Sequence, residues 1–181
     1  MINIMNYFEL FDIPIRLSVD KTAITGRYYA LSRQYHPDFH TRATNTDQEA
    51  MLQQSSLVNK AYKTLLNHDE TLKYVLQLKG LLHEEEKYDL DPEFLGAMME
   101  INEVLMELSA ESQTEKLEEV ELQVKDLIKK IYAAVAPIVE QYQEGITSEK
   151  ELLQVKEYYY RKKYLQRILD KIAQMRNIAA L

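Results

Sequence analysis

The sequence predicts an all-α protein built from two helical parts. Of its 181 residues 46% are apolar, and only four glycines and four prolines interrupt the chain. Leucine, glutamate, lysine, glutamine, methionine and alanine are abundant, and these residues favour helices. Apolar side chains also recur with helical spacing between the breakers. Together these observations indicate a series of amphipathic helices.

Four helices are expected in the first 80 residues, because turn and capping residues punctuate this stretch. Ile13-Pro14 stops the first helix, and Pro37 forces the second to end at about residue 36. Gly80 ends the fourth. The expected helices cover about residues 6–12, a stretch from the capping residues 17–20 to residue 36, residues 47–66, and a shorter stretch around Leu72–Leu78.

Three further helices are expected after a polar linker at residues 81–90, which lacks periodicity. The first follows Asp91-Pro92, with aspartate as N-cap and proline at the first helical position, and runs to about residue 108. The second covers about residues 112–143 and is expected to kink or join at Pro137. The third begins at Thr147 or Ser148. Long antiparallel amphipathic helices of this kind form a bundle.

Composition excludes several classes of protein. The chain has no cysteine, so disulfides, thiolate metal sites and cysteine nucleophiles are excluded. No apolar run approaches the roughly 20 residues of a membrane span, and the N-terminus resembles no targeting segment. We therefore expect a cytoplasmic protein that neither contacts membranes nor carries a cofactor or metal.

Charge is divided unevenly along the chain. Residues 1–80 carry nine Lys/Arg and eight Asp/Glu, whereas residues 81–181 carry thirteen and twenty-one. An acidic second half argues against nucleic-acid binding, which needs a dense basic surface. It suits a basic protein partner, or simply solubility.

The tripeptide His36-Pro37-Asp38 follows a strongly helical stretch. Because proline disfavours helical geometry at the preceding residue, the imidazole and the carboxylate are expected on a stiff, exposed turn. Such a turn is suited to contact with a partner. The alternatives are an ordinary helix-ending turn, or an acid–base dyad, which would need a pocket and a third polar group. The four histidines have no ligand spacing on a helix.

The first 80 residues resemble a J-domain. The resemblance rests on the opening Tyr7-Phe8, on Gln34-Tyr35-His36-Pro37-Asp38 and on Asn59-Lys60-Ala61-Tyr62-Lys63-Thr64-Leu65, which fall in register. It implies a DnaK-type ATPase chaperone as partner, with His36, Pro37 and Asp38 triggering ATP hydrolysis in that partner. Arg27 and Arg33 are the obvious cations of the second helix. Uncharged residues fill places that are often basic in J-domains, namely Thr25, Tyr29, Ala30 and Gln34.

The helix after Asp91 carries two apolar arcs. At about 100° per residue, the first arc is expected to face the bundle core. The second lies beside three glutamates and has the character of a protein-binding surface. The alternative is that the bundle buries both arcs and the glutamates are merely solvated. The first arc holds Phe94, Ala97, Met98, Ile101, Val104, Leu105 and Leu108; the second holds Leu95, Met99 and Met106, beside Glu100, Glu103 and Glu107.

A J-domain, a short linker and an acidic three-helix bundle are together similar to the iron–sulfur-assembly co-chaperones of the HscB type. This resemblance implies an L-shaped arrangement of a J-domain (1–80), a linker (81–90) and a client-binding bundle (91–181). It also implies an IscU-type scaffold as client and an HscA-type chaperone as partner. The implied scaffold contacts are Leu95, Met99, Glu100, Glu103, Glu107 and Tyr164.

Two other functions remain open from the sequence. The chain resembles a J-protein whose client could differ, or it is a structural helical protein with a chance tripeptide. The HscB-type interpretation agrees with the missing cysteines, because a chain without thiolates must act on another protein that holds the cluster. It predicts an activator of a partner's ATPase rather than an enzyme.

Overall fold

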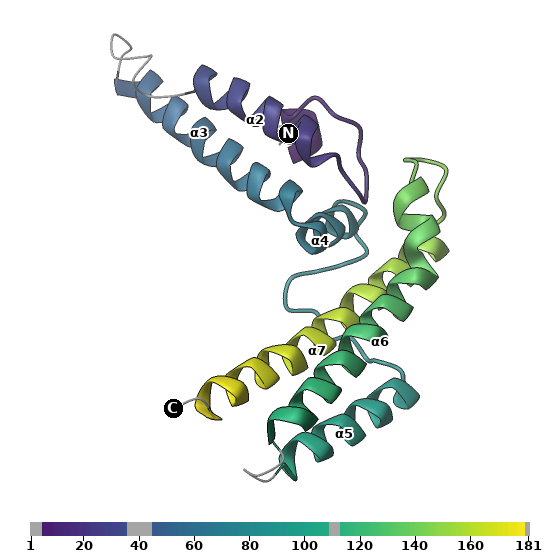
Figure 1. Cartoon of the computed structure of the whole chain (residues 1–181). Coiled ribbons are helices and arrows are strands. Elements are labelled where there is room, and N and C mark those ends of the chain that lie inside the picture. The colour runs from purple at the N-terminus through teal and green to yellow at the C-terminus, as the bar shows by residue number, and fades with distance from the viewer. Residues whose placement is uncertain (1–4, 36–44, 109–112, 180–181) are drawn as a thin grey trace. The chain divides into compact units, whose positions relative to one another are not determined.

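The computed structural model describes residues 5–35, 45–108 and 113–179. In these ranges the secondary structure consists of seven α-helices without a strand, so the predicted all-α fold is confirmed (Figure 1). The helices are α1 (Tyr7–Leu10), α2 (Lys21–Gln34), α3 (Asn45–Leu66), α4 (His68–Leu78), α5 (Pro92–Met106), α6 (Gln113–Gln141) and α7 (Glu149–Ala179).

The chain divides into two compact units. The first comprises residues 1–80 together with residues 139–147, and the second comprises residues 81–138 and 148–181. The turn between α6 and α7 therefore belongs to the same unit as α1–α4, whereas most of α6 and α7 belongs to the unit that contains α5.

The short helix α1 is held by a cap at its N-terminus and by contact with α4. The Asn6 side chain accepts the backbone N–H groups of Phe8 and Glu9, both at 3.0 Å, and the Glu9 carboxylate accepts the N–H of Asn6 at 3.1 Å. This reciprocal arrangement is a capping box. Phe8 is fully buried, and the Tyr7 ring stacks on Tyr74 of α4 with centroids 4.2 Å apart. A four-residue helix is thereby fixed by its cap and by α4.

Helices α2 and α3 are joined by tyrosines. Asp20 caps α2, as the sequence predicts, through hydrogen bonds from the N–H groups of its first turn. The Tyr28 and Tyr62 rings are stacked with centroids 3.9 Å apart, and the Tyr28 hydroxyl donates to Asn59 Oδ1 at 2.9 Å. Tyr62 and Asn59 belong to the expected J-domain motif, so residues of that motif hold α3 against α2.

The turn between α6 and α7 contributes a buried aromatic ring to the first unit. Tyr142 is 1% exposed, and its carbonyl oxygen accepts a hydrogen bond from Arg16 Nη1 at 2.6 Å. Lys79 Nζ lies 2.5 Å from Glu144 Oε1, and this contact raises the pKa of the lysine. Gly145 has a φ of +77°, a left-handed conformation that glycine adopts without strain.

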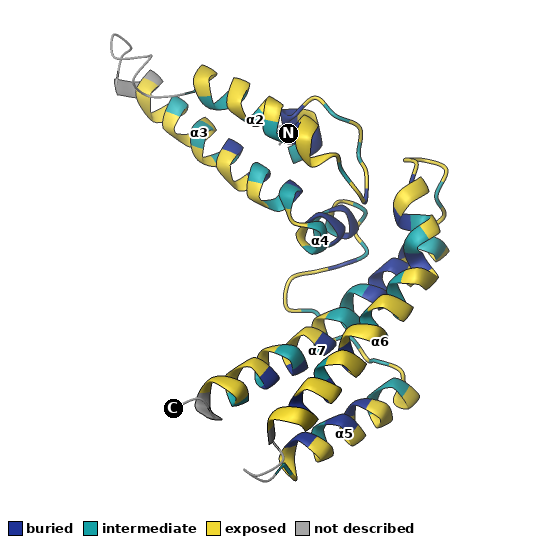
Figure 2. Cartoon of the chain, viewed as in Figure 1, coloured by how far each residue is buried: buried dark blue, intermediate teal, exposed yellow. Residues whose placement is uncertain are grey.

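The second unit is a three-helix bundle with one continuous core. Each of α5, α6 and α7 contributes three buried residues, and the buried side of α5 is visible in Figure 2. Ala97 and Val104 were expected in this core but are exposed, because the other two helices cover a narrower part of α5 than the full apolar arc. The core residues are Met98, Ile101, Leu105, Leu117, Val120, Val124, Leu165, Ile168 and Ile172.

Helix α6 continues through Pro137 to Gln141, so the proline does not mark a join between two helices. A proline inside a helix removes the hydrogen bond to the carbonyl four residues earlier, here that of Ala133. Both Ala133 and Pro137 are exposed, so water can satisfy that carbonyl.

Candidate partner-binding surfaces

Helix α2 leads directly to the predicted chaperone contact. It ends at Gln34 with Tyr35 as C-cap, which agrees with an end forced by Pro37 to within the usual uncertainty of helix ends. His36, Pro37 and Asp38 themselves lie outside the described residues, so their role stays a prediction.

The two cations predicted to contact the chaperone are both exposed but differ in environment. Arg27 Nη1 lies 2.9 Å from Asp12 Oδ2, an exposed ion pair that offsets its charge. Arg33, in the last turn of α2, makes no ion pair with any residue in the described ranges. The two positions are about 120° apart around the helix, so they do not form one row. Tyr29, 62% exposed, lies one turn before Arg33. The outer face of α2 is therefore only weakly basic.

The predicted scaffold contacts of α5 lie outside the bundle core. Asp91 caps the helix by accepting the N–H groups of Glu93 at 2.9 Å and Phe94 at 3.1 Å, as the sequence predicts. Leu95 is half-buried and Met99 is 61% exposed. The expected second apolar arc thus remains accessible in the bundle.

Three glutamates border this accessible arc. Glu100, Glu103 and Glu107 are exposed, and none of them makes an ion pair with another described residue. Three unneutralised carboxylates within two turns produce a negative potential along one side of α5. Their charge is available to a basic partner.

Tyr164 is packed between α7 and α5 rather than freely exposed. Its ring meets Phe94 edge-on, with centroids 6.0 Å apart and planes at 80°. The Arg161 guanidinium lies over the same Phe94 ring, 5.2 Å from its centroid. Such aromatic and cation–π contacts stabilise the arrangement of the two helices. Tyr164 therefore contacts α5 and is half-buried.

Two further apolar residues of α5 are exposed, Met106 as the sequence predicts and Val104 against the prediction. Met106 is 78% exposed and extends the strip that begins with Leu95 and Met99. Val104 is 45% exposed on the other side of the glutamates. Only the positions of α6 and α7 reveal the exposure of Val104, because periodicity alone places it in the core.

The segment at residues 81–90 contains no helix but is fixed against α7. Glu86 Oε1 lies 2.5 Å from Lys156 Nζ, and the lysine is 8% exposed. The Tyr88 ring stacks on Tyr160 with centroids 4.4 Å apart and planes at 3°. The hydrogen bond from Lys156 lowers the pKa of the Glu86 carboxyl, and burial raises the pKa of Tyr160 to about 12. No sequence periodicity signals these contacts.

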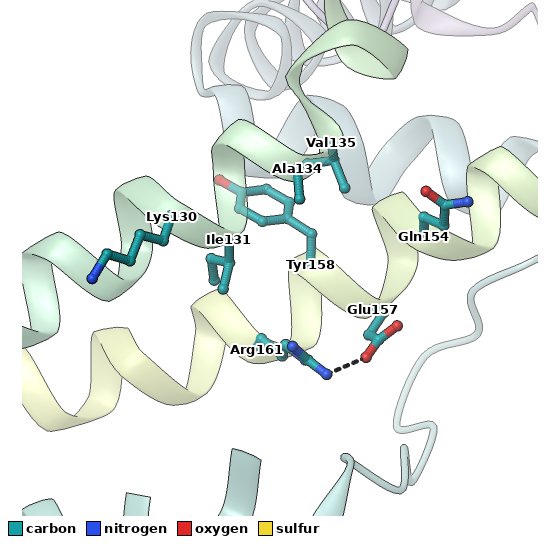
Figure 3. Close-up of a pocket in the computed structure, with 8 residues that line it drawn as sticks. All are labelled: Lys130, Ile131, Ala134, Val135, Gln154, Glu157, Tyr158 and Arg161. Carbon is teal, nitrogen blue, oxygen red and sulfur yellow. Dashed lines mark ion pairs between the residues drawn. The ribbon is translucent and has the colours of Figure 1, made fainter. Parts of the chain in front are cut away.

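A cavity of about 370 Å³ lies between α6 and α7 (Figure 3). Its lining includes Ile131, Val135 and the Tyr158 ring, beside an ion pair in which Arg161 Nη2 lies 2.6 Å from Glu157 Oε1. Among the described residues that line it, Glu157 is the one carboxylate and there is no histidine, and that carboxylate is paired with Arg161.

The described ranges contain no group of three or more His, Cys, Asp or Glu side chains arranged to hold a metal ion. None of their helices is both long enough and apolar enough to cross a membrane.

The architecture of four helices followed by a three-helix bundle is that of a J-domain protein with a C-terminal helical domain. Residues 90–173 match the family model described as the HSCB C-terminal oligomerisation domain. The crystal structure of human co-chaperone protein HscB is similar, with a TM-score of 0.78 and 31% sequence identity, over 96% of this chain and 83% of that chain.

Two curated relatives agree with this match. The chain is 34% identical over 155 residues to the human iron-sulfur cluster co-chaperone protein HscB, covering 85% of this chain and 64% of that protein. It is 36% identical over 107 residues to the co-chaperone protein HscB homolog of Vibrio cholerae, covering 59% of this chain and 63% of that protein. The matches thus span a little under two thirds of both relatives. The chain belongs to the HscB co-chaperone family.

Proposed function

We propose that this chain is a co-chaperone of iron–sulfur cluster biogenesis. Its bundle, residues 91–181, binds an IscU-type scaffold protein, and residues 81–90 connect the bundle to a J-domain formed by residues 1–80. The J-domain delivers the scaffold to a DnaK-type chaperone of the HscA kind. The loop of His36, Pro37 and Asp38 stimulates ATP hydrolysis in that chaperone.

The observation that carries this proposal is the exposed strip on α5. Met99 is 61% exposed beside glutamates that have no ion-pair partner among the described residues, within the segment that the HscB C-terminal family model matches. The core of the bundle is already formed by other buried residues of α5, α6 and α7, so packing inside the bundle does not explain this exposed strip. Apolar residues edged by charge are typical of a protein-binding surface.

The proposed division of labour follows from the side chains present. The sequence contains no cysteine and so cannot ligate a cluster by thiolates, which leaves the cluster to the scaffold. Arg27 is offset by Asp12, so recognition of the chaperone depends little on long-range attraction through α2. A dedicated chaperone partner fits such a surface. In this proposal the chain activates its partner's ATPase and hydrolyses nothing itself.

The test is steady-state ATP hydrolysis by an HscA-type chaperone, with the scaffold and this protein added separately and together. We expect the two additions to act synergistically. Asp38→Asn should abolish the stimulation while scaffold binding persists. Asp89→Asn, an equally conservative change at an exposed aspartate, is the matched control and should stimulate like the wild type.

Full stimulation by the Asp38→Asn variant would contradict the proposed trigger. Stimulation of the chaperone without binding of the scaffold, measured by pull-down, would indicate a J-protein with another client. If the protein changes no chaperone's ATPase rate, the result would indicate a purely structural helical protein.

A further inference from the structure

Helices α5 and α7 lie side by side and run in the same direction. Phe94 contacts Tyr164, with ring centroids 6.0 Å apart, and Asn102 Oδ1 lies 3.4 Å from Lys171 Nζ. The two contacts are eight positions apart on α5 and seven apart on α7. The two helices therefore remain adjacent over about 12 Å of their length. Side chains on the facing outer edges of the two helices therefore form one surface.

The α5 side of this surface is apolar next to α7 and acidic farther away. At about 100° per residue, Leu95, Met99 and Met106 fall immediately beyond Asn102, which touches α7. The three glutamates at positions 100, 103 and 107 follow on the far side of this apolar strip. The strip is thus open to solvent between α7 and a row of carboxylates.

The α7 side of the surface is basic. Arg167 and Lys171 are one turn apart, and Arg167 is exposed without an ion pair to any described residue. The hydrogen bond from Lys171 goes to the neutral amide of Asn102, and Lys171 has no ion pair with a residue in the described part of the chain. Carboxylates and cations therefore border the apolar strip on opposite sides.

We propose that this polarity sets the orientation of the scaffold on the bundle, with Arg167 and Lys171 as specificity-determining residues. The inference rests on the proposed function. It requires a scaffold surface with an apolar ridge, basic side chains along the flank that meets the glutamates, and carboxylates along the flank that meets α7. A partner docked the other way round places like charges together, which costs binding free energy.

The arrangement also disfavours a nucleic acid as the occupant. A phosphate backbone attracted by Arg167 and Lys171 would lie within a few side chains of Glu103, whose charge repels it. A protein surface with both signs of charge satisfies both borders of the strip.

The test compares two charge reversals in the full chain. Arg167→Glu changes an exposed cation at the proposed border, and Lys129→Glu changes an exposed cation on α6. Binding of each variant to the purified apo scaffold is measured by titration calorimetry at about 50 mM and about 500 mM NaCl. Circular dichroism and thermal unfolding verify that both variants fold.

We expect Arg167→Glu to weaken binding about fivefold to tenfold at the lower salt concentration, and much less at the higher one. Lys129→Glu should bind like the wild type. Equal affinities for the two variants, or tighter binding by Arg167→Glu, would overturn the inference and leave the proposed function intact. Absence of binding by the wild type would instead overturn the proposed function.

Discussion

Glu86 and Lys156 form an ion pair that fixes the segment after α4 to the N-terminal half of α7. Their Oε1 and Nζ atoms are 2.5 Å apart, and the two side chains are only 22% and 11% exposed. Tyr88 and Tyr160 stack beside this pair. The segment is therefore part of the second unit's folded structure and not merely a spacer.

Replacing Glu86 by glutamine should destabilise the second unit. The Lys156 ammonium would remain largely buried without its counter-charge, which we expect to lower the free energy of unfolding by about 1–3 kcal/mol. Lys130→Met, which breaks the exposed Asp126–Lys130 pair, is the control and should change stability by less than about 0.5 kcal/mol. Urea denaturation followed by circular dichroism measures both. Equal effects would show that the Glu86 pair contributes no more than a surface pair.

Acid should weaken the protein through the same carboxylate. The hydrogen bond from Lys156 holds the pKa of Glu86 below its ordinary value of 4.5 in the folded state. A depressed folded pKa contributes stability that is present above the unfolded pKa and is lost as the pH falls through the folded pKa. Between about pH 5 and pH 3, the midpoint temperature of thermal unfolding should therefore fall less steeply with decreasing pH in Glu86→Gln than in the wild type. Parallel curves would refute this assignment.

Reversing two carboxylates of α5 should weaken scaffold binding without impairing the J-domain. We expect Glu103→Lys with Glu107→Lys to reduce affinity for the scaffold about tenfold, because both charges border the apolar strip. Glu115→Lys with Glu119→Lys has the same spacing on exposed positions of α6 and serves as the control. Chaperone stimulation in the absence of scaffold should be unchanged in both. If affinity also stays unchanged, the glutamates are only solvated.

Met99 should matter for binding and not for folding. Its side chain is 61% exposed, so Met99→Ala is expected to change the free energy of unfolding by less than about 0.5 kcal/mol while weakening scaffold binding. Leu122→Ala, at a 69% exposed position on α6, should affect neither. Leu105→Ala, in the core, should cost about 2–5 kcal/mol of stability. A folding defect in Met99→Ala as large as that of Leu105→Ala would place Met99 in the core.

Most of the helices could be predicted from the sequence because their signals are local. Asp20 and Asp91 cap α2 and α5 as expected, and α6 begins and ends within two residues of the predicted range. Capping, proline and periodicity act within a few residues along the chain, and no tertiary contact is needed to detect them. At Pro137 the sequence left a kink or a join open, and the continuous helix α6 excludes the join.

The partly wrong prediction concerned which apolar residues are buried. Ala97 and Val104 belong to the same arc as Met98 and Ile101, and residue type alone does not separate them. Which part of the arc is covered depends on where α6 and α7 lie around α5. The Glu86–Lys156 pair was missed for a similar reason, since it joins residues 70 positions apart.

Local sequence signals were enough to predict the helices, the apolar and acidic arcs of α5, and the resemblance to HscB-type co-chaperones. The contact between Lys171 and Asn102, next to the strip that contains Met99, became visible only in the folded structure. The apolar and polar faces of a helix follow from residues that are neighbours in the sequence. Which residues of α5 and α7 lie side by side depends instead on core packing between segments about 70 residues apart.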